Sequence, residues 1–310
     1  MLISIVIPTY NRLDFLKKAV FSVRNQTNKN YEIIVSDNSS NDGTKEWLEV
    51  QDDIIFIRHN DMLPMFKNWN VGLKKAKGDF ILLLTDDDLM NNNCIEKVQA
   101  VINPLQYSMI LGRHDIIDEN DNETILEKEF SYINDGIYQP RDGLLLFSKG
   151  VDFRPCAIFF NKLILMQLPL DSLADKYKLT AFDSEIIQLM STFAPLFILN
   201  LKESIGKNRI WKNSLTSMKI ASNEWHYEID LWTKDFKSFA KILLTSKEIK
   251  NAVFWIKFSN FSVAIASYRK SKKRTIQKSL YFFKKLIILS FFSPSLKNYL
   301  RIIKTMIYQI

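Results

Sequence analysis

The chain has only two cysteines among its 310 residues, Cys94 and Cys156. Two thiols are too few for a disulfide framework or a cysteine-based zinc site, and they fit a compartment in which thiols stay reduced. Long apolar runs are missing too, because no segment approaches the roughly 18 apolar residues that a membrane-spanning helix needs. Met1 leads directly into an apolar segment without a basic stretch or a cleavage site. We therefore expect a buried first strand and a cytoplasmic protein.

Acidic residues are absent from the last part of the chain. Glu248 is the last of 34 Asp and Glu residues, whereas 13 of the 42 Lys and Arg residues follow it, which leaves 29 basic residues up to that point. A mildly acidic body thus precedes a basic tail. Basic and aromatic residues at 269–285, followed by apolar positions up to 310, are typical of helices on an anionic membrane surface. The alternative is that these helices pack on the chain itself or form a homo-oligomer. The acidic body argues against nucleic-acid binding.

Strand-length apolar segments alternate with helical patterns in the first part of the chain. Strands are predicted at residues 3–7, 32–36, 54–57, 80–84 and 108–111, and helices at 12–25, 44–47, 65–77 and 92–102. Thr9 or Asn11 could cap the first helix. Short connections between such elements imply right-handed crossovers and a mostly parallel sheet flanked by helices, which is the α/β class.

The alternation loosens beyond residue 112. The polar segment 116–138 is consistent with a hairpin or an excursion over the sheet. Further elements are predicted as strands at 157–160 and 196–199, helices at 142–147 and 183–190, and helices from about 223 onward. We predict one domain at residues 1–218, with halves at 1–112 and 113–218, and a helical C-terminal region at 219–310.

Three adjacent carboxylates, Asp86, Asp87 and Asp88, follow the apolar strand at 80–84. In open α/β sheets, ligands bind beyond the carboxyl ends of the strands. Adjacent carboxylates repel one another, and Mg²⁺ or Mn²⁺ relieves that repulsion, typically together with a phosphate. The alternative is a solvated acidic turn that caps the next helix.

Four segments resemble motifs of the family 2 glycosyltransferases, which have the GT-A fold. They are residues 5–12 (IVIPTYNR), 35–44 (VSDNSSNDGT), 68–80 (NWNVGLKKAKGDF) and the triad Asp86–Asp88 at the position of the DxD motif. Their order and spacing are more specific than any single motif, and the resemblance extends to about residue 215. It implies an enzyme of class EC 2.4 that moves a sugar, with inversion, from a nucleotide-diphosphate donor to an acceptor hydroxyl.

The resemblance also implies roles for individual residues. The implied nucleotide-sugar-binding residues are Pro8, Thr9, Tyr10, Asn11, Arg12, Asp37, Asn70, Asp86, Asp87 and Arg209. Asp37 matches the residue that accepts the imide N–H of uracil or thymine, which favours a UDP- or dTDP-sugar. Asp86 and Asp88 are the implied ligands of Mn²⁺ or Mg²⁺, which would stabilise charge on the leaving diphosphate. The structural alternatives are a turn cap for Asp37 and an exposed helix residue for Asn70.

Inversion needs a general base that takes the proton of the acceptor hydroxyl. Family members place an acidic residue for this at the start of a helix after the metal strand, often as Glu-Asp. Residues 182–186 (FDSEI) resemble that element, with Phe182 at the Glu position. Asp183 is therefore the implied base and Glu185 the second candidate. The alternative is an N-capping Asp183 followed by a first-turn Glu185.

A second position also departs from the family pattern. Relatives often have Arg-x-His where this chain has Arg209, Ile210 and Trp211. The family His lies near the diphosphate or metal, and an indole cannot replace it as a ligand. Two other functions therefore stay open, a non-catalytic scaffold at the membrane and another nucleotide-diphosphate enzyme. The latter would normally have a Gly-rich loop after the first strand, which this chain lacks.

The basic tail and the resemblance together predict the setting of the reaction. The expected acceptor is a glycan or lipid-linked glycan in O-antigen, capsule or lipooligosaccharide synthesis. The expected location is the inner face of the cytoplasmic membrane, with the protein bound peripherally to anionic lipids.

Overall fold

The computed structural model describes residues 1–124, 133–146, 154–179, 181–199, 202–212, 214–220 and 222–270. They divide into two compact units. The first unit comprises the described residues of Met1–Pro140, Asp152–Lys178 and Phe182–Trp211, and the second comprises the other described residues. The predicted domain limits at 112 and 218 stay predictions.

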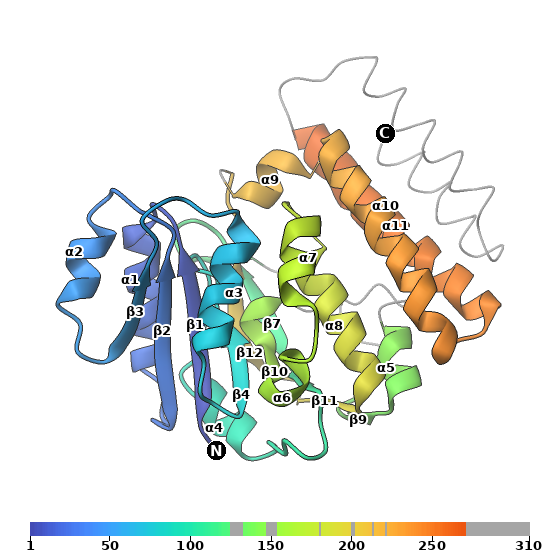
Figure 1. Ribbon diagram of the computed structural model, residues 1–310, viewed down its shortest axis with the longest axis horizontal. Coiled ribbons are helices and arrows are strands. Elements are labelled where there is room, and N and C mark those ends of the chain that lie inside the picture. Colours follow the sequence, from blue (N-terminus) through green and yellow to red (C-terminus); the bar gives the residue numbers. More distant parts are fainter. Residues whose placement is uncertain are drawn as a thin grey trace. The chain divides into compact units, whose positions relative to one another are not determined.

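A large sheet forms the centre of the first unit (Figure 1). Among the described residues, its strands lie in the order β3-β2-β1-β4-β10-β6-β11-β9. Their bounds are β1 Ile3–Thr9, β2 Tyr31–Asp37, β3 Ile54–Arg58, β4 Phe80–Leu83, β6 Met109–Leu111, β9 Gly136–Tyr138, β10 Ile158–Asn161 and β11 Leu196–Ile198. The predicted α/β class is confirmed. The first four strands of this order are parallel, whereas β10 runs antiparallel to both of its neighbours.

Helices cover both faces of this sheet. The helices of the first unit are α1 Leu13–Arg24, α2 Thr44–Glu49, α3 Met65–Lys75, α4 Cys94–Gln99, α6 Lys162–Leu165, α7 Leu170–Lys176 and α8 Phe182–Phe193. Side chains alternate between the two faces along a strand. In β1, Ile5 therefore joins the core beneath α1, whereas Val6 points to α3 on the other face. A Cβ on Gly72 would lie 2.5 Å from Val6 Cγ1, so only glycine permits this close approach.

The first unit also contains a smaller sheet, with its described strands in the order β5-β12-β7-β8. Their bounds are β5 Leu89–Met90, β7 Arg113–Ile117, β8 Glu123–Thr124 and β12 Ser204–Arg209. The hairpin predicted within 116–138 is present as the antiparallel pair β7 and β8, and residues 125–132 lie outside the described part. Because β12 pairs with β5, its last residues come beside the triad.

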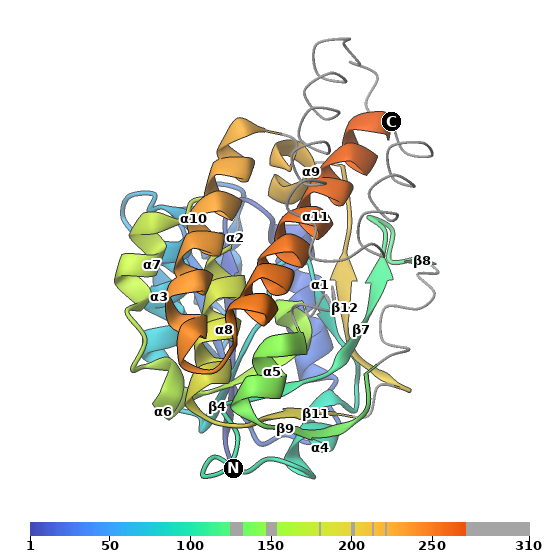
Figure 2. The ribbon, with the colours of Figure 1, turned by 90° about the vertical axis from the view of Figure 1, so that its right-hand side faces the viewer.

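The second unit is helical in its described part, with bounds α5 Pro140–Leu146, α9 Leu215–Lys219, α10 Asn223–Phe239 and α11 Ser246–Lys270. Helices α10 and α11 lie side by side (Figures 1 and 2). Trp225, Ile229, Trp232 and Phe236 follow one another at helical spacing in α10 and are buried. No helix in the described ranges is long and apolar enough to span a bilayer. The predicted membrane-binding tail falls largely on 271–310, outside these ranges.

Candidate active site

The acidic triad occupies the turn between β4 and β5, at the carboxyl end of β4. Because β1 pairs with β4, the loop after β1 comes directly beside it. The Thr9 hydroxyl donates to Asp86 Oδ2 at 2.8 Å. Arg12 Nη1 donates to Asp86 Oδ1 at 3.0 Å and to Asp87 Oδ2 at 3.2 Å. The structure thus brings together two motifs that lie more than 70 residues apart in sequence.

Asp88 is the most buried of the three carboxylates, with 1% of its surface exposed. Thr85 Oγ1 donates to its Oδ2 at 2.6 Å, and the backbone N–H of Arg209 donates to its Oδ1 at 2.8 Å. Asn208 Nδ2 donates to both oxygens, at 3.0 and 3.2 Å. Thr85 and Asn208 are not among the site residues predicted from the sequence, where their adjacency to Asp86 and Arg209 is the signal that points to them.

Burial makes two carboxylates of the triad harder to ionise than exposed aspartates. Burial raises the pKa of Asp86 to about 6, although the charge of Arg12 opposes the rise. Burial, followed by the charge of Asp87, raises the pKa of Asp88 to about 7. A divalent cation would stabilise the ionised form of these buried carboxylates. Hard cations such as Mg²⁺ also prefer oxygen ligands. Asp86 and Asp88 would hold the cation, but in the described part no three acidic, His or Cys side chains form a ready metal site.

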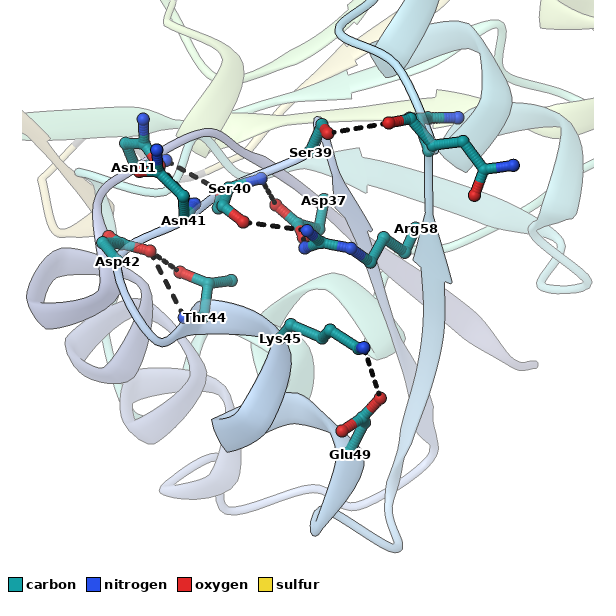
Figure 3. Close-up of polar contacts among 12 residues, drawn as sticks. Asn11, Asp37, Ser39, Ser40, Asn41, Asp42, Thr44, Lys45, Glu49 and Arg58 are labelled. Atoms are coloured by element: carbon teal, nitrogen blue, oxygen red, sulfur yellow. Dashed lines mark hydrogen bonds and ion pairs between the residues drawn. The ribbon is translucent and has the colours of Figure 1, made fainter.

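The carboxylate of Asp37 organises the loop between β2 and α2 (Figure 3). Its exposed fraction is 0%. It forms an ion pair with Arg58 and accepts the N–H of Ser40 at 3.0 Å. Arg58 Nη2 also donates to the Ser40 carbonyl at 2.9 Å, so the three residues form a closed network. A nucleobase that donates an N–H to Asp37 must use the remaining lone pairs of this carboxylate or displace Arg58.

The same loop also fixes the start of α1. Asp42 Oδ2 accepts the N–H of Leu13 at 2.9 Å. Asn11 has a left-handed φ of 51° and accepts the N–H of Asn41 through its side chain at 2.8 Å. The expectation that Thr9 or Asn11 caps α1 is therefore wrong. The Thr9 hydroxyl donates to Asp86 instead. Asp42 provides the cap from the loop after β2, because the pairing of β1 with β2 brings that loop close to the start of α1.

The other residues that are predicted to bind the nucleotide-sugar differ in their exposure. Pro8 lies in buried β1, whereas Tyr10 has 45% of its surface exposed. Asn70 is buried in α3, where its Nδ2 donates to the Leu170 carbonyl at 2.7 Å. The alternative of an exposed helix residue is wrong for Asn70, because this position faces α7. Its role toward a donor stays a prediction.

The predicted catalytic helix is present as α8. Glu185 is buried, accepts a hydrogen bond from the Tyr177 hydroxyl and lies 3.3 Å from Lys176 Nζ. Asp183 is only partly buried. Phe182, which replaces the family Glu, is buried and stacks on Phe66 at a centroid distance of 4.5 Å. Glu185 is thus held by Tyr177 and Lys176. The role of Asp183 as general base stays a prediction.

Arg209 connects the acidic triad to the loop after β7. Its side chain is 0% exposed. Nε donates to the Asp87 carbonyl at 2.7 Å, Nη1 to the Asp118 carbonyl at 2.6 Å, and Nη2 to Asp121 Oδ1 at 2.5 Å. Contact with a phosphate would require these bonds to be replaced. Trp211 Nε1 donates to Asp87 Oδ2 at 2.9 Å, so the residue at the family His position binds the triad through its N–H.

Comparison with known families agrees with this geometry. Residues 4–166 match the sequence model of glycosyl transferase family 2, which covers more than half of the chain. The protein therefore belongs to this family, and the resemblance is confirmed.

Two of the curated relatives have names that include an undecaprenol diphosphate. GalNAc(5)-diNAcBac-PP-undecaprenol beta-1,3-glucosyltransferase of Campylobacter jejuni is 37% identical over 134 residues, which are 42% of this chain and 42% of that protein. UDP-Glc:alpha-D-GlcNAc-diphosphoundecaprenol beta-1,3-glucosyltransferase WfgD of Escherichia coli is 32% identical over 121 residues, which are 38% of this chain and 48% of that protein. The chain thus spans less than half the length of these relatives.

Solved structures show the same fold. S. aureus TarS 1–349 superposes with a TM-score of 0.67 at 15% identity, over 95% of this chain and 81% of that chain. Mannosyltransferase PcManGT from Pyrobaculum calidifontis, in complex with GDP-Man and Mn²⁺, gives a TM-score of 0.53 at 13% identity, over 99% of this chain and 87% of that chain. The predicted GT-A fold is confirmed.

Proposed function

We propose that this protein is a metal-dependent, inverting glycosyltransferase that uses a UDP- or dTDP-sugar and acts on a hydroxyl of a lipid-linked glycan. The observation that carries the proposal is the buried pair Asp86 and Asp88 at the carboxyl end of β4, in a chain of this family. The names of both relatives include an undecaprenol diphosphate, which supports a lipid-linked acceptor. The name of one includes UDP-Glc, which supports a uridine donor.

In this proposal the protein's own residues position the donor. Thr9 and Arg12 orient Asp86, while Thr85, Asn208 and the Arg209 N–H orient Asp88. When bound by these carboxylates, Mn²⁺ or Mg²⁺ supplies Lewis-acid stabilisation of the leaving diphosphate. PcManGT, which shares the fold, was solved with Mn²⁺.

Asp183 is the proposed general base. Its carboxylate takes the proton of the acceptor hydroxyl while the acceptor oxygen forms a bond to the anomeric carbon. The bond from that carbon to the donor phosphate oxygen breaks, and the diphosphate leaves with the electron pair. The partial exposure of Asp183 at the start of α8 is compatible with access to an acceptor.

A non-catalytic scaffold remains the second candidate function, and Trp211 favours it because the family His is missing. Calorimetric titration of UDP, UMP and dTDP, with Mn²⁺ or EDTA, into wild type and Asp88→Ala separates the two candidates. We expect UDP binding that requires both Mn²⁺ and Asp88, followed by measurable donor hydrolysis. Absence of nucleotide binding in every condition would contradict the transferase and favour the scaffold.

Two parts of the setting stay predictions. Peripheral binding to the inner leaflet and self-association were expected from the basic tail, most of which lies outside the described residues. A cytoplasmic location with a membrane-linked acceptor is our proposal for the place of the reaction, supported by the names of the relatives.

A further inference from the structure

Arg12 places a positive charge between two carboxylates of the triad. Its Nη1 lies 3.0 Å from Asp86 Oδ1 and 3.2 Å from Asp87 Oδ2. Burial lowers the pKa of the guanidinium, but the charges of Asp86 and Asp87 outweigh that effect and raise it. Arg12 therefore stays charged. It occupies an oxygen of Asp86, and Asp86 is also a proposed metal ligand.

An aromatic residue supports Arg12 from a second direction. The guanidinium carbon lies 5.1 Å from the centroid of the Trp211 ring, within cation–π distance. The Trp211 N–H donates to Asp87 Oδ2, the same oxygen that Arg12 contacts. Trp211 also packs edge-on against Phe15 at 5.2 Å. Trp211 thus contacts both the guanidinium of Arg12 and the carboxylate of Asp87.

The two arginines of the site differ in how firmly they are held. Arg209 has a fully buried side chain that bonds to the backbone carbonyls of Asp87 and Asp118 and to the carboxylate of Asp121. The side chain of Arg12 is 29% exposed, and its hydrogen bonds with the described residues are to the carboxylates of Asp86 and Asp87. Arg12 is therefore the cation of this site that can change partner at low structural cost.

We propose that Arg12 exchanges partners when the donor binds, an inference that rests on the proposed function. In the free protein Arg12 is the counter-ion of Asp86 and Asp87. When a divalent cation takes over their charge, repulsion between the two cations drives Arg12 from these carboxylates to the diphosphate of the donor. A guanidinium matches phosphate oxygens well because it can donate two parallel hydrogen bonds. Arg12 thereby couples the two events, so that metal and nucleotide each strengthen the binding of the other.

The test measures Mn²⁺ and UDP separately by calorimetry. Mn²⁺ is titrated alone, and UDP is titrated in saturating Mn²⁺, into wild type, Arg12→Gln, Arg12→Lys and Arg24→Gln. Arg24 is the matched control, because it lies at the other end of α1 and pairs with the exposed Asp53. Thermal unfolding of each variant confirms that it is folded.

The expected effects have opposite signs. Arg12→Gln should bind Mn²⁺ alone about tenfold more tightly and UDP about tenfold more weakly, which is a coupling of typical size. Arg12→Lys retains the charge, so we expect Mn²⁺ affinity close to that of wild type but weaker UDP binding. Arg24→Gln should match wild type in both titrations.

Two further outcomes distinguish the proposals. If Arg12→Gln binds UDP but changes both affinities in the same direction, or leaves Mn²⁺ affinity unchanged, the exchange of partners is overturned while the transferase stands. If wild type binds Mn²⁺ but no nucleotide, both proposals are overturned.

Discussion

Removal of the charge of Asp88 should change how the stability of the metal-free protein depends on pH. The pKa of Asp88 is about 7 in the folded chain, against about 3.9 for an unperturbed aspartate. A difference of about three pKa units corresponds to at most about 4 kcal/mol, at 1.36 kcal/mol per unit. Because the folded pKa is the higher one, the contribution to stability is complete below about pH 4 and is lost as the pH rises through about 7.

Asp88→Asn removes this dependence while it retains the shape of the side chain. The amide oxygen can still accept the Arg209 N–H, and the amide NH₂ can donate to the Thr85 hydroxyl. The assay is thermal unfolding in EDTA between pH 5 and pH 8. From pH 5 to the pKa near 7, about 2.7 kcal/mol of this contribution is lost, at 1.36 kcal/mol per unit. For a chain of this length that corresponds to about 4 °C, so wild type should lose up to about 4 °C more Tm than the variant.

A matched control is Asp52→Asn, which removes the charge of an exposed aspartate. Its Tm should follow wild type across the whole range. Addition of Mn²⁺ at pH 8 should raise the Tm of wild type and leave Asp88→Asn nearly unchanged. Parallel profiles of wild type and Asp88→Asn in EDTA would refute the argument that burial of this charge is costly.

Four other substitutions test the remaining assignments. Asp183→Asn should lower the transfer rate by about 10²-fold or more and leave UDP affinity unchanged. Glu185→Gln should retain the transfer rate and lower the free energy of unfolding by about 1–3 kcal/mol. Equal transfer rates for the two variants would contradict these two roles. Gly72→Ala should destabilise by about 1–3 kcal/mol in urea unfolding, because its Cβ would lie 2.5 Å from Val6 Cγ1, and an unchanged midpoint would contradict the packing. Trp211→His should tighten Mn²⁺ binding in the presence of UDP by calorimetry, since imidazole can ligate a metal; weaker binding would argue that the indole is essential.

Local pattern was sufficient for much of the fold. Strand β4 is a continuous apolar run, and β1 is nearly one, with Ser4 and Thr9 as its polar residues. Such runs are recognised in sequence because burial on both faces leaves few polar positions. Pattern could not predict that β10 would run antiparallel between β4 and β6. Strand direction depends on the end of the sheet from which the chain enters the strand, and the residues of β10 themselves do not determine that direction.

The sequence alone determined the family, the α/β class and the acidic triad at the end of β4, because these depend on residues that are neighbours in the chain. The tertiary structure alone decided which polar groups meet. Asp42 caps α1 from 29 residues away, Asn208 binds Asp88 from 120 residues away, and Trp211 supports Arg12. These contacts follow from strand order and pairing, which bring the carboxyl ends of distant strands to one edge of the sheet. Short-range spacing carries no information about that meeting.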